Sequence, residues 1–142
     1  MILLDSNVLI AGHRREDARH AAVKPMLDEL FASPQAFCAP DVVLSAFIRI
    51  TTNPALFRPA TSTAEAFAVA GAVRQRPNCL QVAPGPRHWD LFEEMCEAGQ
   101  ARGPLVTDAY LAALAVEHGC ELLTFDRDFA RFPGLRWRAP VR

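Results

Sequence analysis

The sequence predicts an α/β fold, a three-layer α/β/α domain built around a short and mostly parallel central sheet. Short apolar segments alternate with amphipathic segments of helical periodicity, which is the pattern of a parallel sheet covered by helices on both faces. Of the 142 residues, 51% are hydrophobic and 22% are charged, as in an ordinary globular protein. No repeat, linker or low-complexity segment divides the sequence, so residues 1–142 are expected to form a single domain.

The first third of the chain predicts two strands and two helices. The apolar residues 2–4 predict a buried strand, and residues 36–39 predict a second one. Between them, residues 16–31 have an apolar face at helical spacing, and Pro25 is expected either to kink this helix or to begin another. A further helix is expected from residue 41 to about residue 50, with its first residue, an aspartate, as the candidate N-cap.

The middle of the chain continues the alternation. Residues 55–62 predict a loop, after which Ser62 or Thr63 caps the next helix. Residues 80–82 predict a strand, and a turn rich in proline follows it. A helix over residues 87–98 is indicated by the spacing of its apolar side chains.

The last third predicts one helix and two strands. Thr107 is the candidate N-cap of a helix that runs to residue 118 and ends at Gly119. Residues 121–125 form an apolar run typical of a buried strand, and residues 135–138 predict an edge strand.

Three aspartates fall where an open α/β sheet binds its ligands, beyond the carboxyl ends of the strands. Asp5 follows the first strand, Asp126 follows a late strand, and Asp108 lies in the first turn of a predicted helix. Each has an ordinary explanation by itself, because aspartates cap helices, favour helix N-termini and occur in turns. Their joint placement predicts an acidic cluster.

Such a cluster has a definite chemical consequence. Two carboxylates about 4 Å apart repel each other by roughly 4 kcal/mol at an effective dielectric constant near 20. Protonation, an arginine or a cation must offset this repulsion. Sites made only of carboxylate oxygens suit Mg²⁺ or Mn²⁺, and such an ion can activate water for attack on phosphorus. The pattern therefore predicts a metal-dependent hydrolase.

Several sequence segments match a known family in order and spacing. They are residues 1–7 (MILLDSN), 47–54 (FIRITTNP), 106–109 (VTDA), 112–115 (AALA) and 124–129 (TFDRDF). Through them the sequence resembles the PIN-domain ribonucleases, and among these the VapC toxins of bacterial toxin–antitoxin pairs. The resemblance covers nearly the whole chain and implies a single PIN-like nuclease domain.

The resemblance also implies roles for named residues. It assigns Asp5, Asp108 and Asp126 to catalysis and to Mg²⁺ or Mn²⁺ binding. The supporting residues in this family pattern are Asn7, Thr107 and Asp128. The implied substrate is structured or single-stranded RNA, and the implied partners are a second copy of the chain and a VapB-type antitoxin that occupies the site.

One position departs from the family pattern. The family usually carries a glutamate three residues before the arginine of the middle segment, where this sequence has Ala46 before Arg49. The loss of one carboxylate predicts weaker metal binding. Two hypotheses follow: an active endoribonuclease, or a catalytically weak module that binds RNA or a partner protein.

A phosphatase of the haloacid dehalogenase type would also begin with an aspartate after its first strand. That family needs a second acid two residues later, where this chain has Asn7, and a lysine late in the chain, whereas Lys24 is the only lysine. The sequence therefore disfavours this class.

The overall charge of the chain does not indicate a nucleic-acid partner, because the formal net charge is −1 at pH 7. A basic stretch nevertheless occurs soon after the first strand, and it either contacts RNA phosphates or forms a solvated helix face. Its members are Arg14, Arg15, Arg19, His20 and Lys24. The sequence contains neither a signal-peptide pattern nor an apolar run of membrane-spanning length, so a cytoplasmic protein without membrane contact is expected.

Overall fold

The computed structural model of the protein describes residues 1–141, which contain a four-stranded sheet with the strand order β2-β1-β3-β4. Its strands are β1 (Ile2–Leu4), β2 (Phe37–Cys38), β3 (Glu121–Leu123) and β4 (Arg136–Arg138). All three strand pairings are parallel. The predicted α/β fold is therefore confirmed, with a sheet that is wholly parallel over the described residues.

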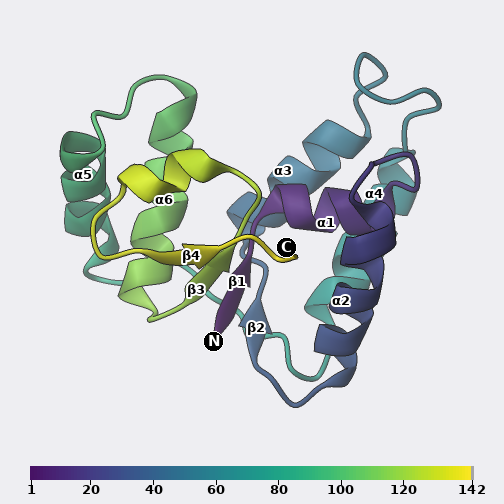
Figure 1. Cartoon of the computed structure of the whole chain (residues 1–142), viewed down its shortest axis with the longest axis horizontal. Coiled ribbons are helices and arrows are strands. Elements are labelled where there is room, and N and C mark those ends of the chain that lie inside the picture. The colour runs from purple at the N-terminus through teal and green to yellow at the C-terminus, as the bar shows by residue number, and fades with distance from the viewer. Residues whose placement is uncertain (142) are drawn as a thin grey trace.

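Helices cover both faces of this sheet (Figure 1), as the three-layer prediction requires. The α-helices are α1 (Ser6–His13), α2 (His20–Ala32), α3 (Asp41–Thr51), α4 (Thr63–Arg74), α5 (His88–Ala98) and α6 (Pro104–Glu117), and a 3₁₀ helix, η1 (Arg127–Arg131), follows β3. Helices α5 and α6 lie on one side of the sheet in Figure 1, and α1 to α4 lie on the other. Within residues 1–141, every helix is too short or too polar to cross a bilayer.

The sheet is held in register by its buried residues. Leu4 of β1 pairs with Leu123 of β3, and Leu3 pairs with Leu122. All four side chains are almost completely buried between the helical layers. Burial of a leucine side chain contributes roughly 1.5–3 kcal/mol, so a shift in register would be costly. The carboxyl ends of β1 and β3 are thereby fixed at the same level.

Helix α1 was not predicted from the sequence. The helix begins directly after Asp5, which serves as its N-cap by accepting a hydrogen bond from the Ser6 N–H. It packs closely on α2, since a Cβ atom on Gly12 would lie 2.4 Å from Cδ1 of Leu27. Helix α2 begins at residue 20 rather than at residue 16, and it continues through Pro25, so Pro25 does not begin a second helix.

Three further local predictions are corrected by the structure, while the Ser62 cap of α4 is confirmed. Pro40, not Asp41, is the N-cap of α3. Thr107 lies inside α6, because this helix begins at Pro104 after Gly103, whose positive φ and flexible backbone suit an abrupt helix start. The strand expected at residues 80–82 does not form, and a single bridge from Phe37 to Cys79 takes its place.

Candidate active site

The carboxyl ends of β1 and β3 bring together two segments from opposite ends of the chain. The Asp5 N–H donates to the Leu123 carbonyl over 3.0 Å, which extends the pairing of the two strands by one residue. Directly beyond it, the Thr124 hydroxyl donates to Oδ2 of Asp5 over 2.7 Å. The sheet therefore aligns the first strand with the segment that leads to Asp126.

The carboxylate of Asp5 is held by three different neighbours. Oδ1 accepts from the Ser6 N–H at 2.7 Å, and Oδ2 accepts from Thr124 and, over 3.3 Å, from Nδ2 of Asn7. Burial raises the pKa of Asp5 above its usual value, the hydrogen bonds from Thr124 and Ser6 oppose that rise, and the charge of Asp126 adds to it. The side chain is thus fixed in place, and no basic side chain within residues 1–141 forms an ion pair with it.

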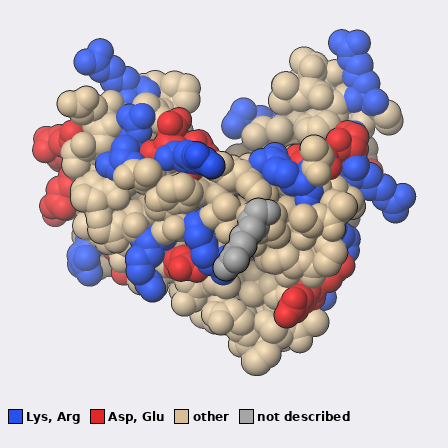
Figure 2. Space-filling model, in the orientation of Figure 1, with Lys and Arg blue, Asp and Glu red and all other residues tan. Residues whose placement is uncertain are grey.

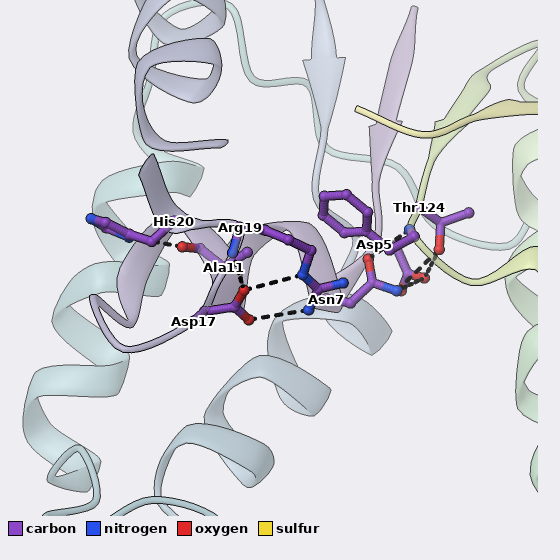
Figure 3. Close-up of polar contacts among 8 residues, drawn as sticks. Asp5, Asn7, Ala11, Asp17, Arg19, His20 and Thr124 are labelled. Atoms are coloured by element: carbon purple, nitrogen blue, oxygen red, sulfur yellow. Dashed lines mark hydrogen bonds and ion pairs between the residues drawn. The ribbon is translucent and has the colours of Figure 1, made fainter. Parts of the chain in front are cut away.

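Asn7 and Thr124 connect the two segments (Figure 3). Asn7 donates to Thr124 Oγ1 over 3.1 Å, and its carbonyl oxygen accepts from the Phe125 N–H at 3.2 Å. Thr124 is fully buried, and its hydroxyl oxygen also accepts from the Asp126 N–H at 3.0 Å. Asn7, predicted to support the site, thus contacts Asp5, Thr124 and Phe125. Thr124 was not predicted as a site residue, although it lies in the TFDRDF segment beside Asp126.

Asp126 begins the 3₁₀ helix η1. Its Oδ1 accepts from the Asp128 N–H over 2.8 Å, which makes Asp126 the N-cap of η1. The Asp128 side chain is exposed, and its carboxylate lies 3.9 Å from Nη2 of Arg131. Asp128 therefore orients Asp126 through its backbone, while its own carboxylate lies at the edge of the acidic group.

Asp108 faces Asp5 across a cleft between α3 and α6. The cleft has a volume of about 250 Å³. Its lining comes from β1–α1 (Asp5, Ser6), α3 (Val42, Val43, Ala46, Arg49, Ile50) and α6 (Pro104, Thr107, Asp108, Leu111). Two of the three predicted aspartates thus share one cleft, and Thr107 lines it from the exposed first turn of α6.

The third aspartate, Asp126, does not line the cleft, but its negative charge affects the ionisation of Asp108. Burial and, in decreasing order, the negative charges of Asp126, Asp5 and Asp128 together raise the pKa of Asp108 to about 6. Arg131 acts in the opposite direction. All the acids predicted for the site are therefore close enough to affect the ionisation of Asp108.

The donor set fits a hydrated divalent cation better than a closed metal cage. Within residues 1–141, no three histidine, cysteine or acidic side chains converge on one point in the manner of a preformed metal site. Mg²⁺ commonly takes one or two carboxylates and keeps several of its waters. Asp5 and Asp108 are the residues that fit this requirement, because both are partly buried, both line one cleft, and neither forms an ion pair with a described residue.

Two residues of α3 complete the cleft. Ala46 lines it with a methyl group, at the position where the family resemblance expects a glutamate. Arg49, one turn further along α3, also lines the cleft, and its guanidinium makes no hydrogen bond or ion pair with residues 1–141. Arg49 was not predicted as a site residue, although it is the arginine of the middle sequence segment.

A larger cavity of about 560 Å³ lies between α1, α2, α3 and α4. Its lining is apolar with several basic side chains, and Asp28 is its only acid among the described residues. It therefore lacks the acidic group needed for the predicted metal chemistry, and the smaller cleft is the candidate active site.

Comparison with known proteins gives the family of this chain. The family model described as the PIN domain matches residues 2–135. The chain belongs to the PIN-domain family. PIN proteins similar to it over their full length include Ribonuclease VapC25 and Ribonuclease VapC31 of Mycobacterium tuberculosis, at 43% and 44% identity. In both comparisons, 99% of this chain and 99% of the relative are covered.

Solved structures show the same PIN fold at lower sequence identity. The VapBC2 structure from Rickettsia felis, bound to a DNA fragment from its promoter, matches with a TM-score of 0.69 at 15% identity and covers 98% of both chains. The VapC20 structure from Mycobacterium tuberculosis, a toxin that cleaves the sarcin–ricin loop, matches with a TM-score of 0.62 at 22% identity. That match covers 96% of this chain and 99% of VapC20.

Proposed function

We propose that this PIN domain is a Mg²⁺-dependent endoribonuclease, with Mn²⁺ as an alternative ion, and that it acts as the toxin of a toxin–antitoxin pair. The observation that carries the proposal is the meeting of Asp5 and Asp108 in one cleft, with Asp126 close enough to raise the pKa of Asp108. Asp5 lies more than 100 positions from both Asp108 and Asp126 in the sequence. The full-length relatives named as VapC ribonucleases support the reaction class.

In this proposal, some residues hold the metal ion and others orient the carboxylate that binds it. Asp5 and Asp108 would hold the ion, and Asp126 would add negative charge beside them. Thr124 and Asn7 fix the orientation of the Asp5 carboxylate by hydrogen bonds of 2.7 and 3.3 Å. When bound, the divalent ion would lower the pKa of a water and stabilise charge on the leaving oxygen of the phosphodiester.

The partners follow from the same proposal. The substrate is RNA, and the inhibitor is a VapB-type antitoxin, by analogy with similar solved structures of VapBC complexes from Rickettsia felis and nontypeable Haemophilus influenzae. A homodimer in the cytoplasm is part of the proposal. A size measurement of the purified protein with and without its antitoxin would test this assembly.

A second function is favoured by Ala46, which places a methyl group in the cleft where a carboxylate would strengthen metal binding. Under this alternative the chain binds RNA or a protein without turnover. It predicts RNA retention in a binding assay with no cleavage in Mg²⁺ or Mn²⁺.

The deciding experiment is cleavage of total RNA by the purified protein, with end mapping, in Mg²⁺, in Mn²⁺ and in excess chelator. We expect cleavage only with a metal ion, and loss of it in Asp5→Asn and Asp108→Asn. Asp90→Asn is the matched control, because Asp90 is an exposed aspartate on α5 outside the cleft. Cleavage that survives in both site variants would rule out the proposed function.

A further inference from the structure

The five members of the basic stretch have different environments in the structure. Arg14 binds Glu16, the Thr61 hydroxyl and the Pro59 carbonyl, while Lys24 forms an exposed ion pair with Asp28. His20 forms a hydrogen bond with the Ala11 carbonyl. Arg15 is exposed and makes no ion pair within residues 1–141. Arg19 contacts Asp17 and Phe125. Arg19 is therefore the member whose contact reaches the segment that carries Asp126.

The guanidinium of Arg19 is held by two neighbours. Nε and Nη2 donate to Oδ1 and Oδ2 of Asp17, both over 3.1 Å, and the planar group lies over the ring of Phe125 with Cζ 4.2 Å from the ring centroid. The Asp17 carboxylate also accepts from the Arg19 N–H at 2.8 Å. The side chain stays 42% exposed. An arginine fixed in this way has already lost most of its rotational freedom, so it binds an anion at a lower entropic cost.

Phe125 connects Arg19 to the acidic site. It lies between Thr124 and Asp126 in the sequence, and its N–H donates to the side-chain oxygen of Asn7 over 3.2 Å. Asn7 in turn donates to Asp5. A positive group is thus fixed beside a site that carries several negative charges. On the face shown in Figure 2, acidic and basic side chains meet at the rim of the hollow between the two helical sides.

A polyanionic strand can approach such an acidic site only if nearby cations offset the repulsion. Asp17 occupies the edge of the guanidinium that contains Nε and Nη2, while Nη1 donates no hydrogen bond to any residue from 1 to 141. Phe125 covers one face of the planar guanidinium, so the remaining N–H groups offer in-plane donors, which match the oxygens of a phosphate.

We propose that Arg19 binds a backbone phosphate of the RNA outside the cleavage point, and so positions the strand across the Asp5–Asp108 cleft. Asp17 and Phe125 act through Arg19, by fixing its guanidinium. Such a contact sets the position of the strand without reading its sequence. This inference rests on the proposed ribonuclease function and adds a substrate-positioning residue to it.

The competing explanation is structural: Arg19 only ties the loop before α2 to the segment after β3. The two explanations differ in the salt dependence of RNA binding, because one lost phosphate contact reduces the slope of log K against log [salt] by about 0.7 for a single strand. A structural tie changes the unfolding temperature and leaves that slope unchanged.

The test is fluorescence anisotropy with a labelled, mixed-sequence single-stranded RNA over a series of KCl concentrations. It uses the Asp108→Asn protein as the non-cleaving background. We expect Arg19→Gln to weaken binding about tenfold and to lower the salt slope by about 0.7. Arg15→Gln removes the same charge four residues away and should weaken binding threefold or less. Equal effects of the two variants, or an unchanged slope in Arg19→Gln, would overturn the proposal.

A second variant keeps the test valid if Arg19→Gln fails to fold. Phe125→Leu removes the ring beneath the guanidinium but retains an apolar side chain and the net charge, and it should weaken RNA binding severalfold. Unchanged binding in Phe125→Leu contradicts the proposal. The two levels of inference remain distinguishable, because RNA cleavage by the wild-type chain tests the proposed function separately from these binding measurements.

Discussion

The hydroxyl of Thr124 donates a 2.7 Å hydrogen bond to Oδ2 of Asp5, and so joins residues that lie 119 positions apart in the chain. The same hydroxyl oxygen accepts from the Asn7 side chain and from the Asp126 N–H. One buried threonine therefore fixes the Asp5 carboxylate and the start of the Asp126 segment together.

Thr124→Val should damage both the stability and the activity of the protein. The variant keeps the side-chain volume, but it leaves the Asp126 N–H without its acceptor and the Asn7 amide with Asp5 alone, at a cost of roughly 1–3 kcal/mol in the free energy of unfolding. RNA cleavage should fall strongly, because Asp5 loses its shortest side-chain contact. Urea unfolding and a cleavage assay measure the two effects. Thr124→Ser retains the hydroxyl and should lose much less of either property, so equal losses in both variants would contradict this role.

The contribution of Asp108 to the stability of the metal-free protein should fall as the pH rises from about 4 to about 6. The pKa of Asp108 is about 6 in the folded protein and 3.8 in its reference state, so the folded protein binds the proton more tightly. A carboxyl group of this kind stabilises the fold fully below pH 4, and the stabilisation is lost as the pH passes the folded-state pKa. Solvent screens this partly buried group, so the loss is at most about 2 kcal/mol.

Asp108→Asn tests this assignment directly. At pH 7 without metal, the variant should unfold at a higher temperature than the wild type, and at pH 4 the two should coincide. Addition of Mg²⁺ should stabilise the wild type more than the variant. Thermal unfolding across this pH range measures the difference, with Asp90→Asn as the exposed control. A variant less stable than the wild type at pH 7 would mean that Asp108 is not repelled by its neighbours.

Two glycines in helices should respond in opposite ways to alanine. Gly12→Ala places a Cβ atom 2.4 Å from Cδ1 of Leu27, a buried side chain between α1 and α2, and should destabilise the fold by about 1–3 kcal/mol. Gly71 of α4 has no atom within 4 Å of the added Cβ, so Gly71→Ala should stabilise the protein by about 0.5–1 kcal/mol. Chemical unfolding of both variants measures the effects. Stabilisation by both substitutions would show that the α1–α2 contact is loose enough to adapt.

The sheet and the acidic group were predictable because parallel strands present their carboxyl ends at one edge. Asp5 and Asp126 follow strands that pair directly, so their meeting follows from sheet topology. That Asp108 would meet Asp5 could be predicted only from the path of α6. This helix packs against β3 and η1 and brings Asp108 into the cleft. Local spacing alone could not supply that path.

Helix α1 was missed because its sequence lacks an amphipathic pattern. Residues 8–12 are all buried, so their apolar side chains surround the helix and no polar face reveals its period. The cap at Thr107 was wrong for a different reason, since proline at the first position of α6 is the stronger start signal. At residues 80–82, Leu80 is 48% exposed, and this apolar segment is not part of the buried sheet. The errors at α1 and at residues 80–82 reflect tertiary burial that a one-dimensional pattern does not contain, whereas the error at Thr107 came from overlooking a start signal that the sequence carries.

The position of Ala46 makes the consequence of a restored carboxylate predictable. Ala46 lines the cleft together with Asp5 and Asp108, so Ala46→Glu adds a further acid to the same cleft. Without metal, the added repulsion should lower the unfolding temperature at pH 7. With Mg²⁺, the added ligand should tighten binding about tenfold, which corresponds to about 1.4 kcal/mol of extra stabilisation at saturating metal. RNA cleavage should rise, most clearly at low Mg²⁺ concentration.

Ser45→Glu is the matched control, because Ser45 is the exposed neighbour of Ala46 on α3 and does not line the cleft. It adds the same charge to the same helix, so a general electrostatic effect would appear equally in both variants. Calorimetric titration with Mg²⁺ and thermal unfolding with and without the ion separate the two possibilities. If Ala46→Glu bound Mg²⁺ no better than Ser45→Glu, the cleft between α3 and α6 would not be the place where the metal is held.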